Sequence, residues 1–136
     1  MSTQKKATYV VIPLAFLPNS APAGNAALCV FHQSPALFFD YIDHLYRHQP
    51  DEALDWATSD ILLNFAEHVT GINLGSLQEC MEQHQYYTQL QQNLSLASHI
   101  MGDTVQTPSL YINGRIVSPL TKEEIDRMVA ESRNLE

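Results

Sequence analysis

Two cysteines, Cys29 and Cys80, have the side chains best able to carry chemistry, because a thiolate is both a nucleophile and a metal ligand. A dithiol oxidoreductase needs two thiols close together at the start of a helix, where the helix dipole lowers the pKa of the first sulfur. The second sulfur then resolves the mixed disulfide. Here the cysteines lie far apart, each among apolar residues with helical spacing. We therefore predict no catalytic residue at either position.

A second group with possible chemistry is Asp40, His44 and His48, whose spacing places all three on one face of a helix. Two imidazoles and a carboxylate can hold zinc. The alternative is a solvated polar face opposite Phe38 and Leu45, and we favour it because no fourth ligand is specified. We assign no metal site. The sequence also has no glycine-rich phosphate loop, and we expect no cofactor.

The strongest local pattern begins at Thr107-Pro108. Alternating apolar residues follow, then Asn113-Gly114 and a second short apolar run. Asn and Gly tolerate the positive φ angles of a type I′ turn, so the pattern predicts two antiparallel strands joined by a two-residue turn. Thr121, with Glu124 in the third position after it, forms a capping box that predicts a C-terminal helix.

Helical patterns occupy the middle of the chain, and each has recognisable start and stop residues. We expect helices to begin at Ser20, at Ser34-Pro35, at Asp60 and at Asn73 or Ser76, with Pro50, Gly71 and Gly102 as stops. The last helix extends to Ile100 and has the least regular pattern. Its residues 83–93 are rich in Gln and Tyr, and we expect a bend there.

Composition limits the class of protein. A chain of 136 residues with 45% apolar residues is long enough for one domain with a real core. Its net charge of −8 repels phosphate backbones and anionic lipid, so we expect neither a nucleic-acid nor a membrane partner. No apolar run reaches the length of a membrane-spanning helix.

Together these patterns resemble the DsbA family of thiol-disulfide oxidoreductases, which carry a helical insertion inside a thioredoxin fold. The matching hairpin is Thr107-Pro108 followed by Leu110-Tyr111-Ile112-Asn113-Gly114-Arg115, and the matching start of the insertion is Phe38, Tyr41, Asp43, Leu45 and Gln49. The resemblance spans residues 8–133 and implies a partial thioredoxin-like α/β fold in one domain, residues 1–136. Residues 1–19 and 103–136 would form the sheet part, with an N-terminal strand and a C-terminal hairpin and helix, and residues 20–102 the all-helical insertion.

The N-terminal residues support two interpretations. Lys5-Lys6, the apolar residues 7–17 and Ala21-Pro22-Ala23 imitate a secretory signal, which would imply an exported or periplasmic protein. Alternatively, residues 8–12 form a β-branched and aromatic strand ended by Pro13, which would imply a cytoplasmic protein. We favour the strand, because a hydrophobic strand running into a proline-bounded loop is what the family resemblance implies.

The sequence departs from the family at the catalytic centre. DsbA-like proteins begin with a strand and a Cys-x-x-Cys helix, and no residue here matches those cysteines. Thr107 and Pro108 do match the cis-proline loop, which in the family binds substrate backbone as an added strand. They are the predicted substrate-binding residues, and a polypeptide is the implied partner.

The resemblance also bears on Cys29 and Cys80, because some family members have a second, non-catalytic disulfide at matching places. Two interpretations stay open: a structural disulfide, or two buried reduced cysteines. The missing strand would in addition expose sheet edges. Either residues 8–12 pair directly with residues 109–113, or a second copy covers the edge, and we favour a homodimer.

Three hypotheses of function follow. The first is a DsbA-family protein without its own Cys-x-x-Cys, either part of a longer or split reading frame or a descendant that lost the dithiol, and not redox-active alone. The second is a non-catalytic module that binds a peptide or small molecule at the cis-proline loop. The third is a metal-binding helical protein.

Overall fold

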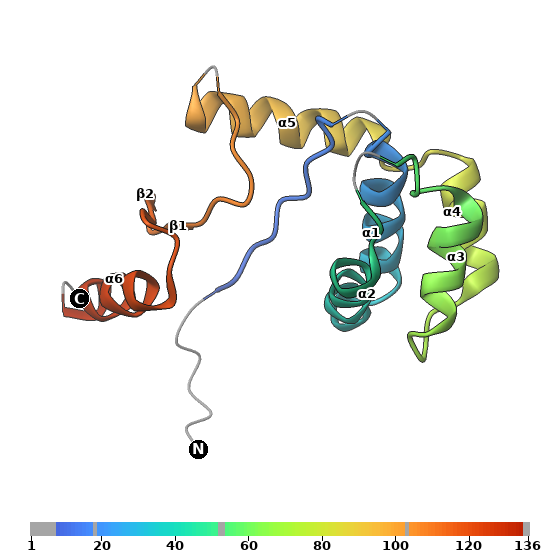
Figure 1. The fold of residues 1–136 in the computed structure, drawn as a ribbon, viewed down its shortest axis with the longest axis horizontal. Coiled ribbons are helices and arrows are strands. Elements are labelled where there is room, and N and C mark those ends of the chain that lie inside the picture. Colours follow the sequence, from blue (N-terminus) through green and yellow to red (C-terminus); the bar gives the residue numbers. More distant parts are fainter. Residues whose placement is uncertain (1–7, 18, 52–53, 103, 135–136) are drawn as a thin grey trace. The chain divides into compact units, whose positions relative to one another are not determined.

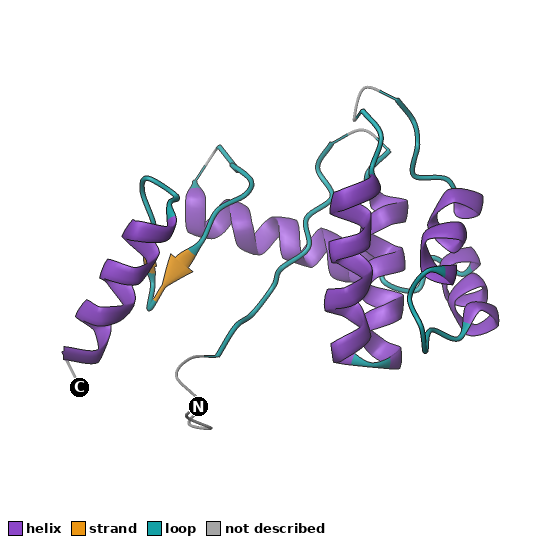
Figure 2. Cartoon of the chain, turned by 60° about the horizontal axis from the view of Figure 1, so that its bottom comes forward, coloured by secondary structure: helices purple, strands orange, loops and turns teal. Residues whose placement is uncertain are grey.

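The computed structural model describes residues 8–17, 19–51, 54–102 and 104–134. These parts are mostly helical, with two short strands (Figures 1 and 2). The helices are α1 (Ala21–Gln33), α2 (Pro35–His48), α3 (Ser59–Glu67), α4 (Leu74–Glu82), α5 (Tyr87–Met101) and α6 (Lys122–Asn134), and the strands are β1 (Tyr111–Ile112) and β2 (Arg115–Ile116). None of these helices is both long and apolar enough to cross a membrane. The chain divides into two compact units, residues 1–97 and residues 98–136.

Helix α1 is the centre of the first unit. All six residues from Asn25 to Val30 are buried, as expected of a helix with protein on every side. It contacts α2, α3 and α4, which bury Tyr41, Leu62 and Leu77, respectively, in the same hydrophobic core. Burying a leucine of this kind contributes about 1.5–3 kcal/mol. The apolar stripes predicted from the sequence therefore meet in one core.

Helix boundaries in this unit follow local signals. Helix α2 begins directly after Ser34 and ends before Gln49-Pro50, as predicted. Thr58 Oγ1 accepts a hydrogen bond from the Ile61 N–H at the start of α3. At the start of α4, Asn73 Oδ1 accepts a bond of 2.9 Å from the Ser76 N–H, which confirms Asn73 as the helix start.

The single long helix predicted from Asn73 to Ile100 is in fact two helices. Helix α4 ends at Glu82, a turn follows, and α5 begins at Tyr87. In the turn His84 has a positive φ of 50°, and the Tyr86 N–H donates a 2.9 Å hydrogen bond to Oδ1 of the buried Asn25. The predicted bend is therefore a complete break, stabilised by an acceptor from α1.

The predicted strand over residues 8–12 is wrong. Residues 8–16 have no regular secondary structure, and Tyr9 and Val10 are 68% and 70% exposed. A strand needs a partner for its backbone groups, and the strands that the structure describes, β1 and β2, pair with each other. The segment is held instead by the Asn93 Nδ2–H, which donates to the Pro13 carbonyl at 3.0 Å, and by stacking of Tyr9 on Phe39. The basic start of the signal-like interpretation, residues 1–7, lies outside the described residues.

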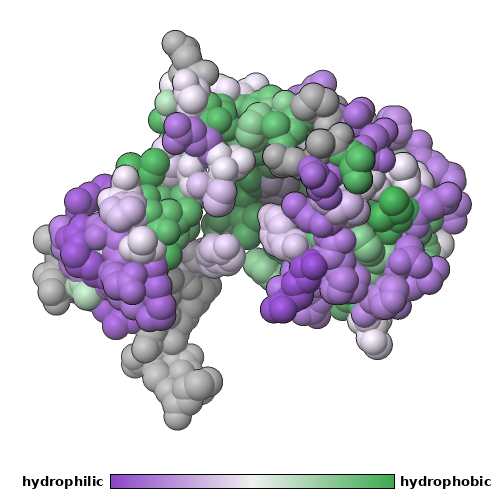
Figure 3. Space-filling model, viewed as in Figure 1, coloured by the Kyte–Doolittle hydropathy of each residue, from purple (hydrophilic) through white to green (hydrophobic). Residues whose placement is uncertain are grey.

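The second unit contains the predicted hairpin and C-terminal helix. Strands β1 and β2 are antiparallel, and Asn113 and Gly114 have φ angles of 49° and 83°, as a type I′ turn requires. Thr121 Oγ1 accepts from the Glu124 N–H and caps α6. Val117 and Met128 are buried in this unit. The face of α6 drawn in Figure 3 is mostly hydrophilic, in keeping with its charged sequence.

Candidate functional site

The proline loop lies directly before β1. Thr107 and Pro108 are both exposed, and the peptide bond between them is cis. The Ser109 hydroxyl donates a 2.6 Å hydrogen bond to the Gln106 carbonyl, so the residues on either side of the loop are joined. The structure thus places both predicted substrate-binding residues at the start of the first strand of the hairpin, where a ligand can approach them.

Strand β1 has one paired and one unpaired edge among the described residues. The Val117 N–H donates to the Leu110 carbonyl at 2.8 Å, so these two residues form a hydrogen-bonded pair. Pairs alternate along an antiparallel ladder, which makes Tyr111 and Ile116 a non-hydrogen-bonded pair. The N–H and C=O of Tyr111 therefore point away from β2. This unpaired edge offers main-chain donors and acceptors to an extended ligand.

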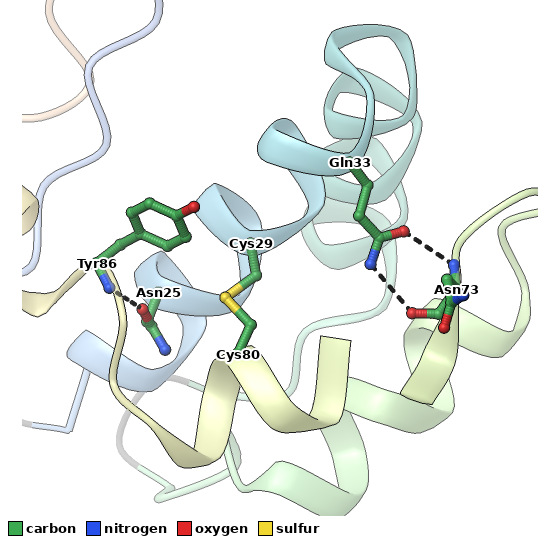
Figure 4. Close-up of a disulfide and its surroundings, with 6 residues drawn as sticks. All are labelled: Asn25, Cys29, Gln33, Asn73, Cys80 and Tyr86. Atoms are coloured by element: carbon green, nitrogen blue, oxygen red, sulfur yellow. Dashed lines mark hydrogen bonds between the residues drawn. A yellow bond between two sulfur atoms is a disulfide. The ribbon is translucent and has the colours of Figure 1, made fainter. Parts of the chain in front are cut away.

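Cys29 and Cys80 form a disulfide with an S–S distance of 2.08 Å and a Cα–Cα distance of 6.1 Å (Figure 4). Of the two interpretations left open by the sequence, the structure has the bridge. It joins α1 to α4, and Cys29 is only 2% exposed. Because the sequence has only these two cysteines, neither is a free thiol.

Polar bonds flank this disulfide (Figure 4). The Gln33 side chain, one helical turn after Cys29, donates to the Asn73 carbonyl and accepts from the Asn73 N–H at 3.0 and 2.9 Å. One turn before Cys29, Asn25 accepts the bond from Tyr86. The disulfide thus lies between two further links from α1 to the chain around α4, in a setting typical of a structural bridge.

The histidines do not assemble as the zinc hypothesis predicts. His44 and His48 stack with ring centroids 4.0 Å apart, and His68 of the turn after α3 stacks on His44 at 5.2 Å. Asp40 is not part of this cluster. No group of three His, Cys, Asp or Glu residues within the described ranges is arranged to hold a metal ion. Burial, and then the charges of His48 and His68, lower the pKa of His44.

A cavity of about 550 Å³ in the first unit was not predicted. It lies at the start of α1 and is lined by residues from three separate stretches of chain, including Asn25, Asp55 and His84. One sequence signal was available: Asn25 is a polar residue inside an alanine-rich apolar run.

Comparison with known proteins agrees with this geometry. A family model described as thioredoxin matches residues 2–131. The crystal structure of Chlamydia trachomatis DsbA superposes with a TM-score of 0.81 at 28% identity, over 92% of this chain and 68% of that one. The chain therefore belongs to the thioredoxin family, and its fold is DsbA-like.

Two Bacillus subtilis comparisons support the same fold. Disulfide bond formation protein D of strain 168 is 25% identical over 99 residues, which is 73% of this chain and 44% of that protein. The crystal structure of oxidised BdbD has a TM-score of 0.72 at 24% identity, over 84% of this chain and 61% of that one. The chain thus spans less than half the length of the curated relative that it matches.

Proposed function

We propose that this chain binds an extended polypeptide along the unpaired edge of β1, beside Thr107 and Pro108, and that it does not catalyse thiol-disulfide exchange by itself. The observation that supports this most directly is the outward direction of the Tyr111 N–H and C=O. An added strand binds through main-chain hydrogen bonds of this kind and needs no sulfur.

The absence of redox catalysis is proposed from the state of the cysteines. Exchange begins with attack by, or on, an accessible sulfur. Cys29 is buried in the helical core and bonded to Cys80, and the sequence contains no Cys-x-x-Cys. A chain with these features lacks both the low-pKa thiolate and the resolving thiol of a dithiol enzyme.

Nuclear magnetic resonance tests the binding site. The probe is reduced and alkylated insulin B chain, an extended peptide without free thiols. We expect a saturable change in the amide resonances of Ser109 and Tyr111 on titration. Saturable binding that leaves both resonances unchanged would place the peptide elsewhere and contradict the proposal.

An insulin-reduction assay with dithiothreitol tests the redox half. The proposal predicts that the purified chain leaves the rate at that of dithiothreitol alone. A rate above this blank that is lost in the Cys29→Ala, Cys80→Ala double variant would show that the buried bridge is redox-active.

A further inference from the structure

The two faces of the β1–β2 hairpin differ in burial. Successive side chains of a strand point to opposite faces, and residues paired across the ladder share a face. Tyr111 and its partner Ile116 therefore lie on one face. Ile112 and its partner Arg115 lie on the other, and so does Val117, which follows Ile116. Val117 is 4% exposed and Ile116 is 50% exposed, so the face that carries Tyr111 is the open one.

Helix α6 lies on the opposite face of the hairpin. Arg115 belongs to that face, and its Nη1 donates to Oε1 of Glu131 in α6 at 3.1 Å. The helix therefore leaves the face of Tyr111 uncovered, in agreement with the exposure of Ile116. On this open face Ile116 flanks Tyr111 on the side of β2, and the other side of Tyr111 is the unpaired edge of β1.

A strand added at this edge would place one of its residues directly opposite Tyr111. The N–H and C=O of Tyr111 point to the edge, so in an antiparallel ladder a single peptide residue exchanges both bonds with it. The side chain of that peptide residue shares the open face, with its Cβ atom about 5 Å from that of Tyr111. Pairs of an aromatic ring with an aromatic or β-branched side chain are more stable than pairs with alanine.

Charge adds a second restriction on the peptide residue at this position. Residues 104–114, which include the proline loop and β1, contain no charged side chain. The cation of the hairpin, Arg115, lies on the opposite face and is bonded to Glu131. A peptide carboxylate opposite Tyr111 would therefore meet an aromatic ring and no cation.

We infer that the β1 edge selects extended peptides with an aromatic or β-branched residue opposite Tyr111, and that the Tyr111 ring determines this specificity. The inference rests on the proposed peptide binding and goes beyond it. Main-chain hydrogen bonds give an added strand its affinity, whereas the side chains beside it distinguish one peptide from another.

A series of blocked peptides tests the inference. Each peptide is a short run of threonines with one central residue, which is phenylalanine, valine, alanine or glutamate. The full, isotopically labelled chain is titrated with each, and binding is followed at the amide resonances of Ser109 and Tyr111. We expect the phenylalanine and valine peptides to bind about two- to fivefold more tightly than the alanine peptide, and the glutamate peptide to bind more weakly than alanine.

The outcomes distinguish the inference from the proposed function. Equal affinities for the phenylalanine and alanine peptides, with saturable shifts at both amides, would overturn the inference and leave peptide binding at the β1 edge intact. The absence of a saturable shift with every peptide would overturn both.

Two alanine variants test the part played by the Tyr111 ring. Tyr111→Ala keeps the main-chain groups of the edge but should abolish the preference for phenylalanine over alanine. Ile116→Ala removes an exposed side chain from the same face and should keep the preference, because Ile116 lies on the far side of Tyr111 from the added strand. An unchanged preference in Tyr111→Ala would overturn the inference. If Tyr111→Ala loses the hairpin, the peptide series on the unaltered protein still decides.

Discussion

The Val117 N–H donates a 2.8 Å hydrogen bond to the Leu110 carbonyl, and this bond shows the register of the hairpin. The register decides which backbone N–H and C=O groups bond between the two strands and which point away from the hairpin. Leu110 is bonded to Val117, the residue after β2, so its neighbour Tyr111 directs its own N–H and C=O to the other edge. These outward groups are the ones that the proposed added strand would bond, and main-chain bonds of this kind need no sulfur.

Removing the disulfide should destabilise the helical core. Cys29 and Cys80 close a loop with a sequence separation of 51 residues, and a bridge of that length contributes about 4 kcal/mol in the chain-entropy account. We expect the Cys29→Ala, Cys80→Ala double variant to unfold at a clearly lower urea midpoint than the oxidised protein. Mass spectrometry with and without reductant confirms that the starting protein contains the bridge. An unchanged midpoint would show that the bridge adds no stability.

Tyr41 should contribute to stability through its hydroxyl as well as its ring. It is fully buried and donates to the Leu62 carbonyl at 2.9 Å. Tyr41→Phe removes this buried hydrogen bond and should cost about 1–2 kcal/mol in urea unfolding. Tyr46→Phe is the matched control, because Tyr46 is 73% exposed and its change should be within about 0.5 kcal/mol.

Tyr41 should also make the free energy of unfolding depend on pH in the alkaline range. Burial raises the pKa of Tyr41 well above its ordinary range, so the folded state favours the neutral hydroxyl. The neutral Tyr41 hydroxyl therefore makes its full contribution to stability below the pKa of about 10 that it has in the unfolded chain. That contribution is lost as the pH rises above this value. Unfolding measured between pH 8 and 11 should show a steeper loss in the unaltered protein than in Tyr41→Phe. Parallel curves for the two proteins would contradict this.

The histidine cluster should be visible as a coupled titration. Burial and the nearby His48 and His68 lower the pKa of His44, while Asp43 acts in the opposite direction. His68→Ala removes one of the neighbouring charges, so the pKa of His44, followed by the NMR shifts of its ring protons, should rise. His32→Ala serves as the control, because His32 is not among the groups that shift His44. An equal effect of both variants would show that the cluster does not form.

Local signals account for most of the predicted fold. The starts of α2 and α4 and the Asn113-Gly114 turn are confirmed because each depends on neighbouring residues alone. The strand over residues 8–12 is wrong because a strand depends on a partner distant in sequence. His68 was not predicted beside His44 for the same reason, since helix periodicity cannot show how two helices pack.

Homodimer formation stays a prediction. The unpaired edge of β1 and the exposed Tyr9 and Val10 are surfaces that a second copy could cover. We expect size-exclusion chromatography with light scattering to give a mass that increases with concentration toward that of two chains. A single-chain mass at high concentration would exclude a stable dimer.

Two proline variants test the central claim most directly, since they remove one N–H each from opposite edges of the same hairpin. Tyr111→Pro removes the outward N–H of β1, and Ile116→Pro removes that of its partner in β2, while neither breaks a β1–β2 bond. The measurement is the affinity of both variants for the alkylated insulin B chain. The account predicts that Tyr111→Pro binds about three- to tenfold more weakly than the unaltered protein and that Ile116→Pro binds equally well. Equal affinity of the two variants, with the hairpin intact by NMR, would contradict peptide binding at the β1 edge.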